Sequence, residues 1–103
     1  MCCMRVIITD SCKKEIRKRL SAEQKRQLHM FIHKFKNDIQ QAKRLTTWLF
    51  EVKLQEKRVY YVLFYGIAAF VAVSTKNDQQ LVIDGLKKRK ELYKALVRRI
   101  NTQ

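Results

Sequence analysis

An apolar run over residues 59–74, VYYVLFYGIAAFVAVS, restricts the fold of this chain more than any other feature. The run is shorter than the roughly 20 residues that a helix needs to cross a bilayer. It is rich in Val, Tyr and Phe, and Gly66 divides it into two halves of strand length. It therefore predicts two buried strands joined by a tight turn, in preference to a membrane helix.

The residues before this run predict a strand followed by a helical hairpin. Residues 5–9 are a short β-branched run, and Asp10-Ser11 offers two N-cap candidates for a helix over residues 11–20. Ser21 and Gln24 have the spacing of a capping box, which opens a second helix. The expected apolar positions are Cys12, Ile16 and Leu20 in the first helix and Leu28, Phe31, Ile32, Phe35 and Ile39 in the second.

After residue 41 the apolar period changes from helical to alternating. Three strands and two turns are expected, the strands over residues 48–54, 58–65 and 68–75 and the turns at residues 55–57 and Gly66. A long amphipathic helix is expected over residues 80–100. The order β-α-α-β-β-β-α describes one α+β domain of residues 1–103, with a small, mainly antiparallel sheet. Helices cover one face of this sheet, and the other face is expected to be open.

The charge of the chain indicates a polyanionic partner. It carries 23 Lys and Arg residues against 9 Asp and Glu residues, a formal net charge of +14 over 103 residues. Such a protein accumulates at polyanions, because each Lys or Arg that neutralises a phosphate releases condensed counterions. Nucleic acid, the ribosome or an acidic protein are the expected partners. For any single residue, a solvated helix surface is the alternative explanation.

The cysteines and histidines do not predict a metal or cofactor site. Cys2, Cys3 and Cys12 cannot all pair with one another, and no Cys-x-x-Cys occurs, so reduced thiols in a cytoplasmic protein are expected. His29 and His33 lie four residues apart, but the Glu of the His-Glu-x-x-His metalloprotease motif is missing. Partly exposed helix histidines are therefore the preferred interpretation. The first residues show no secretory signal, and no membrane partner is expected.

A cluster of charges is expected at one end of the predicted sheet. Lys53, Arg58 and Lys76 lie at or beside the ends of three successive strands, and Glu51 shares a strand face with Lys53. RNA cleavage without a metal needs a base for the 2′-hydroxyl, cations for the phosphorane charge and an acid for the leaving oxygen. Lys, Arg and Tyr can fill these roles. Charges that keep sheet edges from aggregating are the competing interpretation.

Tyr60 is the tyrosine expected to contribute a hydroxyl to this cluster. Alternation along the strand places Tyr60 on the face of Arg58 and Tyr65 on the opposite face. Arg58 is expected to be an exposed strand cation that contributes little to folding. The sequence therefore predicts that Arg58→Ala lowers activity and leaves thermal stability almost unchanged.

Four stretches of the chain resemble the RelE/ParE superfamily of bacterial toxins, nearest to its HigB-like addiction module killer branch. The capped helical hairpin is similar to the family's opening, and WLFEVKL at residues 48–54 is similar to its Leu/Trp-Glu-Leu-Arg strand. RVYY at residues 58–61 resembles its Tyr-Arg-Val-Tyr strand, and KNDQ at residues 76–79, leading to Ile83, resembles its Lys-x-x-Gln-x-x-x-Ile segment. The likeness lies in the order and spacing of these motifs over nearly the whole chain.

The resemblance implies the toxin of a type II toxin-antitoxin system, a ribosome-dependent endoribonuclease that cuts messenger RNA, needs no cofactor and is inhibited by a cognate antitoxin protein. It implies that Arg58 contacts the scissile phosphate. The expected catalytic residues are Arg58, Lys53, Lys76 and Tyr60, and the expected substrate-binding residues are Lys57, Gln79 and Glu51. The alternatives are a non-enzymatic inhibitor of DNA gyrase, of the ParE type, and a basic nucleic-acid-binding protein with the same fold.

Overall fold

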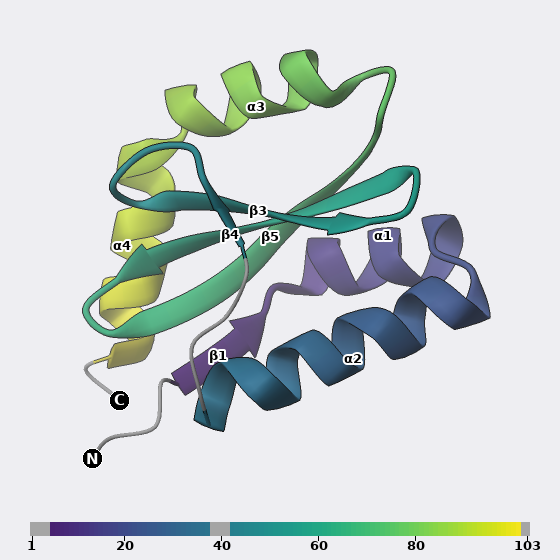
Figure 1. Ribbon diagram of the computed structural model, residues 1–103. Coiled ribbons are helices and arrows are strands. Elements are labelled where there is room, and N and C mark those ends of the chain that lie inside the picture. The colour runs from purple at the N-terminus through teal and green to yellow at the C-terminus, as the bar shows by residue number, and fades with distance from the viewer. Residues whose placement is uncertain (1–4, 38–41, 102–103) are drawn as a thin grey trace.

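The computed structural model describes residues 5–37 and 42–101, which form a mixed five-stranded sheet and four helices (Figure 1). This arrangement confirms the predicted α+β class. The elements are β1 (Arg5–Ile8), α1 (Asp10–Arg19), α2 (Ala22–Asn37), β2 (Lys43–Arg44), β3 (Leu49–Leu54), β4 (Lys57–Phe64), β5 (Ile67–Thr75), α3 (Gln79–Lys88) and α4 (Lys90–Asn101).

The sheet has the strand order β1-β5-β4-β3-β2. The central strands β3, β4 and β5 form the predicted antiparallel meander. The first strand, β1, is added parallel to β5, from the pair Arg5↔Ile67 to the pair Ile8↔Phe70. The two-residue strand β2, which the sequence did not predict, pairs antiparallel with β3 at the other edge.

The apolar run at residues 59–74 forms most of β4 and β5, as predicted. The two strands are joined by Tyr65 and Gly66, with φ angles of 54° and 71°. Two successive residues with positive φ form a type I′ turn, whose twist matches the twist of the flanking strands. Gly66 adopts this backbone without strain. Within the described part of the chain, no helix is both long and apolar enough to cross a membrane.

Each helix of the helical hairpin begins with a side-chain cap. Ser21 and Gln24 form the predicted capping box: the Ser21 N–H donates to Gln24 Oε1 at 2.9 Å, and the Gln24 N–H donates to Ser21 Oγ at 3.1 Å. The predicted cap of the first helix was wrong, because Thr9 caps α1 by accepting from the Cys12 N–H at 3.2 Å. Ile39 and the side chain of Phe35 lie outside the described residues.

Helices cover both faces of the sheet, so the prediction of one open face was wrong. On one face, a buried cluster joins the helical hairpin to β3, β4 and β5. Its helical members include Cys12 of α1, Leu20 at the C-cap of α1 and Leu28 of α2. On the other face, α3 and α4 contribute Ile83, Leu86 and Val97 to a second cluster. The physical reason is that β4 and β5 are apolar at nearly every position, and a sheet with two apolar faces requires cover on both.

The single helix predicted over residues 80–100 is two helices. The chain breaks at Arg89, whose N–H donates to the Leu86 carbonyl at 3.0 Å, and α3 and α4 then run in different directions (Figure 1). A straight helix of that length would extend about 32 Å. The eight residues of β4 span only about 26 Å. The break lets both halves pack on the same sheet.

Candidate functional site

Three predicted cations meet at one end of the sheet. Lys53 of β3 is the direct cross-strand partner of Arg58 in β4, and Arg58 is in turn opposite Ser74 in β5. Residues in such positions have Cβ atoms about 4.5–5.5 Å apart. Lys76 follows β5, and its N–H donates to the Glu56 carbonyl of the β3–β4 turn at 3.0 Å. The predicted convergence of these three residues at one sheet end is therefore confirmed.

This strand end also carries polar residues from the next positions along the same face. Glu51 is paired with Tyr60 across β3 and β4, and Gln79 is the first residue of α3. We refer to the whole set as the strand-end cluster: Glu51, Lys53, Arg58, Tyr60, Ser74, Lys76 and Gln79.

Arg58 is a buried residue that holds the β3–β4 turn. It is 7% exposed, and its Nη1 donates to the carbonyls of Gln55 at 2.8 Å and Lys57 at 3.0 Å. The turn contains only two residues, Gln55 and Glu56, and Gln55 has a φ of 59°. The expectation that Arg58 is an exposed cation was wrong, and its burial removes the reason for expecting little effect on folding. Alternation predicted its face correctly but not that α3 and its preceding segment would close over that face.

Two further members of the cluster are buried and paired within the fold. Tyr60 is fully buried, and its hydroxyl lies 2.9 Å from Ser74 Oγ. Burial raises the pKa of Tyr60 to about 12, and the charge of the Glu51 carboxylate adds to this effect. Glu51 is 5% exposed and accepts a hydrogen bond from Gln79 Nε2 at 2.6 Å. Tyr60 is thus a protonated, structurally engaged phenol that does not reach the surface.

The accessible members of the cluster are Lys53 and Lys76. Both are exposed, and within residues 5–37 and 42–101 neither side chain forms an ion pair or hydrogen bond. This end of the sheet therefore presents two ammonium groups to solvent, and the buried Arg58 lies opposite Lys53 in the adjacent strand.

Lys57 lies outside the cluster. Its ammonium group donates to the Arg19 carbonyl at 2.9 Å, at the last residue of α1. A cation at this position satisfies an orphan carbonyl and interacts favourably with the negative end of the helix dipole. The structure thus gives Lys57, a predicted substrate-binding residue, a helix-capping contact on the face of the sheet opposite Arg58.

The segment that carries Lys76 is fixed by contacts that the sequence did not suggest. Asp78 Oδ1 accepts hydrogen bonds from the Thr75 N–H at 2.7 Å and the Thr75 hydroxyl at 2.9 Å. Arg19 of α1 lies 3.5 Å from Asp78 and also donates to the Val73 carbonyl at 3.1 Å. The hydrogen bonds from Thr75, assisted by the Arg19 charge, lower the pKa of Asp78. These contacts hold the residues on either side of Lys76.

Ser74 is the site residue that sequence reasoning missed. It is fully buried opposite Arg58 and bonds the Tyr60 hydroxyl. The available signal was its position: Ser74 is a polar residue inside an apolar strand, and its alternation matches the face of Arg58. A buried hydroxyl needs a partner, and this requirement points to the tyrosine across the strand pair.

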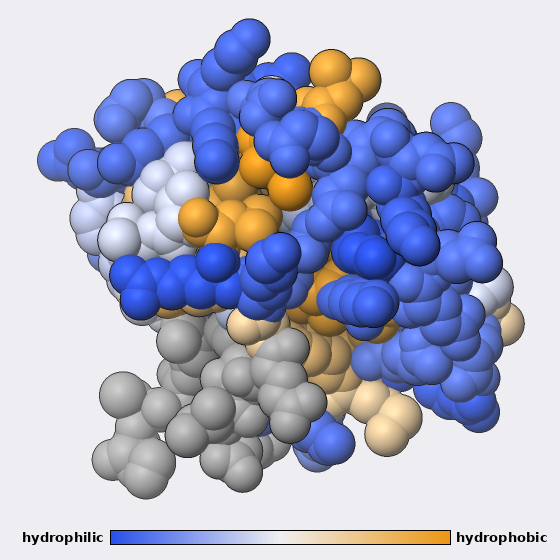
Figure 2. All heavy atoms as spheres, turned by 45° about the horizontal axis from the view of Figure 1, so that its top comes forward, coloured by the Kyte–Doolittle hydropathy of each residue, from blue (hydrophilic) through white to orange (hydrophobic). Residues whose placement is uncertain are grey.

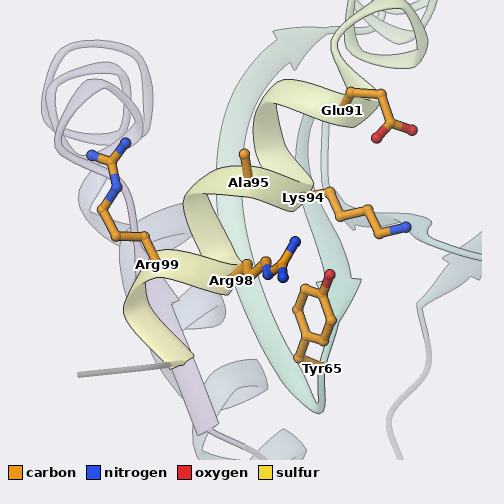
Figure 3. Close-up of a pocket in the computed structure, with 6 residues that line it drawn as sticks. All are labelled: Tyr65, Glu91, Lys94, Ala95, Arg98 and Arg99. Carbon is orange, nitrogen blue, oxygen red and sulfur yellow. The ribbon is translucent and has the colours of Figure 1, made fainter.

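Tyr65 lies at the opposite end of β4 from the cluster. The positive φ at this turn residue ends the strand alternation, and the side chain lies against α4 (Figure 3). The predicted placement of Tyr65 on the face opposite Arg58 was therefore wrong, because α4 covers the Arg58 face.

The cysteine thiols and histidine imidazoles give less indication of a catalytic or metal site than the strand-end cluster does. Cys12 is buried, which raises the pKa of its thiol to about 12, and Cys2 and Cys3 lie outside the described residues. His29 and His33 are exposed on α2. The described residues contain no group of three or more His, Cys, Asp and Glu side chains placed to hold a metal ion.

Comparison of the chain with protein-family models, curated proteins and solved structures finds no match.

Proposed function

We propose that this protein is the RNA-cleaving toxin of a type II toxin-antitoxin system and that it cuts messenger RNA on the ribosome. The observation that carries the proposal is the convergence of Lys53, Arg58 and Lys76 on one sheet end. The order of the predicted motifs, which resembles the RelE/ParE superfamily, supports the same function. A net charge of +14 supplies general affinity for RNA.

The proposed reaction is attack of the RNA 2′-oxygen on the adjacent phosphorus. The O2′–P bond forms, the P–O5′ bond breaks, a proton leaves the 2′-hydroxyl and a proton joins the 5′-oxygen. In this scheme Lys53 and Lys76 neutralise the phosphorane, and one of them protonates the leaving oxygen. Glu51 is the carboxylate of the cluster that can accept the 2′-hydroxyl proton, once Gln79 is displaced from it.

Buried residues have a positioning role in this scheme. The Tyr60–Ser74 hydrogen bond and the contacts of Arg58 to the β3–β4 turn fix the strands that carry the exposed lysines. Because these groups are engaged within the fold, the ribosome must supply the alignment of the RNA. Cleavage is therefore proposed to depend on the ribosome.

The same burial favours a second candidate, a basic nucleic-acid-binding protein that does not cut. Arg58 already donates to two carbonyls, and Tyr60 is fully buried. In this candidate the exposed lysines bind phosphate, and the buried polar groups serve only the fold.

The cognate antitoxin of the proposed toxin would be an acidic protein with apolar contact residues. Its acidity would complement the charge of +14. Leu81 and Leu92, on α3 and α4, are 76% and 63% exposed. In Figure 2, where the top of Figure 1 with α3 is turned toward the viewer, apolar side chains lie among largely hydrophilic ones. An acidic segment with apolar anchors would bury such side chains.

The test is cleavage of messenger RNA by purified protein, with naked transcript compared with transcript on programmed ribosomes. Lys53→Ala and Lys76→Ala should each lower the cleavage rate on ribosomes by about a hundredfold, the usual effect of removing one stabilising donor. Lys18→Ala, which removes one exposed charge from α1, is the matched control and should cut like the unmodified protein.

Three results would contradict the nuclease proposal. Equal rates for the two strand-end variants and the Lys18→Ala control would separate the cluster from the chemistry. Rapid cutting of naked transcript would remove the ribosome from the scheme. RNA binding without any cutting would establish the second candidate instead.

A further inference from the structure

A hollow of about 450 Å³ lies between the β4–β5 turn and α4, at the opposite end of β4 from the strand-end cluster (Figure 3). We call it the turn pocket, and it is lined by Tyr65, Glu91, Lys94, Ala95, Arg98 and Arg99. Its volume falls in the range of about 300–1,000 Å³ typical of ligand sites. Tyr65 lies seven positions after Arg58 along the strand, which places the turn pocket about 23 Å from the cluster.

The turn pocket combines an aromatic ring with unpaired positive charge. Tyr65 is 47% exposed, and its ring stands beside Lys94 and Arg98, while Arg99 extends away from them (Figure 3). Within the described residues, neither Lys94 nor Arg98 has an ion pair or a side-chain hydrogen bond. Three cations and one carboxylate, Glu91, give the lining a net positive charge.

The backbone at Tyr65 gives a second, independent indication. The residue has a φ of 54° at the first central position of a type I′ turn. Asn, Asp and Gly are the residues that favour this position, and a bulky side chain in the left-handed region is uncommon and strained. Strained backbone of this kind clusters at active sites and ligand clamps, where the surrounding structure holds it. Folding alone would favour Asn-Gly over Tyr65-Gly66.

We propose that the turn pocket binds one nucleotide of a single-stranded RNA, with the base stacked on Tyr65 and its phosphate between Lys94 and Arg98. Stacking on an exposed ring beside backbone-tracking cations is the way in which proteins bind single strands. A duplex keeps its bases stacked inside and cannot place one on this ring. Glu91, at the far wall, can accept a hydrogen bond from a base amino group.

This inference rests on the RNA-binding part of the proposed function and not on cleavage. It gives the protein two separate contacts to one RNA strand. The strand-end cluster has lysines for phosphate, whereas the turn pocket has a ring for a base.

The central variant is Tyr65→Asn, because it places the favoured Asn-Gly pair in the turn and is expected to fold at least as well. Fluorescence anisotropy with an RNA of about eight nucleotides, within the size that single-strand sites cover, measures affinity over a range of salt. Tyr65→Asn should weaken binding by about 5- to 150-fold, from the usual range for one stacked base. The slope of log affinity against log salt should not change, since no charge is removed.

Variants that remove a charge from the turn pocket should change the salt slope, which Tyr65→Asn leaves unchanged. Arg98→Ala and Lys94→Ala should each lower the salt slope, by at most about 0.7, the value for one phosphate contact to a single strand. Tyr65→Phe keeps the ring and should bind like the unmodified protein. Lys18→Ala, on α1, is the matched charge control and should leave the slope unchanged.

An abasic RNA of the same length completes the test. The unmodified protein should bind it as weakly as Tyr65→Asn binds the normal RNA, and Tyr65→Asn should cause no further loss. Unchanged affinity of Tyr65→Asn for normal RNA, or equal losses on normal and abasic RNA, would overturn the proposed stacking. If Tyr65 contributes to RNA binding but the protein does not cleave on ribosomes, this inference stands and the nuclease proposal is refuted. If the protein cleaves but Tyr65 has no role in binding, only this inference is refuted.

Discussion

The two ends of β4 use similar residues in different ways. At one end, Arg58 and Tyr60 are buried and bonded to protein groups. At the other end, Tyr65 is half exposed and lies beside Arg98, which has no such partner in the described part of the chain. An arginine and a tyrosine occur at both ends, but only one end presents them to solvent.

The difference shows that residue type does not assign a role. A buried arginine or tyrosine must have its hydrogen bonds satisfied by the fold, so its removal is felt first as lost stability. An exposed one is held by few contacts and is available for a ligand, so its removal is felt first as lost binding. The strand-end cluster and the turn pocket can be separated by measuring both quantities for each variant.

Arg58→Ala should give the largest loss of stability. The guanidinium donates to the carbonyls of Gln55 and Lys57, and hydrogen bonds to charged groups contribute about 1.5–3 kcal/mol. The free energy of unfolding, measured by urea titration, should fall by about 2–3 kcal/mol. Arg98→Ala, at the exposed end, should change it by less than about 0.5 kcal/mol.

Arg58→Lys sharpens this comparison, because it keeps the charge but loses the planar fork. Its stability should lie between those of the unmodified protein and Arg58→Ala. Equal stability of Arg58→Ala and the unmodified protein would show that the turn does not depend on these two hydrogen bonds.

Alkaline pH should destabilise the protein through its buried acids. The pKa of Tyr60 rises from an ordinary 10.0 to about 12 on folding, mainly by burial. The folded chain therefore keeps the phenol proton at a pH where the unfolded chain has lost it. This contribution to stability is complete below about pH 10 and is lost as the pH rises to about 12.

Unfolding measured at a series of pH values tests this prediction. Tyr60→Phe should flatten the alkaline decline, although it also removes the hydrogen bond to Ser74 at every pH. Cys12, whose pKa rises from 9.0 to about 12 because of burial, begins the decline near pH 9. A decline with the same slope in Tyr60→Phe would exclude Tyr60 as a contributor.

Local sequence signals predicted one cap and one turn of the fold correctly. The Ser21–Gln24 capping box and the turn at Gly66 depend on residues next to one another in the chain, and the structure has both. The predicted turn at residues 55–57 was wrong by one residue: it would place Leu54 opposite Arg58, whereas the observed turn contains only Gln55 and Glu56 and places Lys53 there.

The signals failed where distant elements meet. Residues 80–100 keep one apolar stripe across Arg89, so the pattern alone favours a single helix, and only the limited length of the sheet explains the break. Alternation gave Arg58 its correct face, but burial of that face depends on α3, which lies far along the chain. Tyr65 was misplaced because its left-handed backbone ends the alternation that was used to place it.

A double-mutant cycle on Tyr60 and Ser74 should show a coupling of about 1 kcal/mol. Tyr60→Phe and Ser74→Ala each leave a buried hydroxyl without its 2.9 Å partner, at a cost of about 1–2 kcal/mol in the free energy of unfolding. The double variant removes both hydroxyls and should cost less than the sum. Strict additivity in urea titrations would mean that this hydrogen bond does not stabilise the strand-end cluster.

Lys53→Ala should cause the smallest change in stability, although Lys53 is the direct cross-strand partner of Arg58. Its ammonium is exposed, and no ion pair or hydrogen bond holds it within the described residues. The free energy of unfolding should therefore stay within about 0.5 kcal/mol of the unmodified protein. Each phosphate contact to a single strand contributes about 0.7 to the salt slope of RNA binding, and Lys53→Ala should lose that amount. A loss of stability as large as that of Arg58→Ala would show that Lys53 belongs to the buried support of this sheet end. An unchanged slope would show that no phosphate binds beside it.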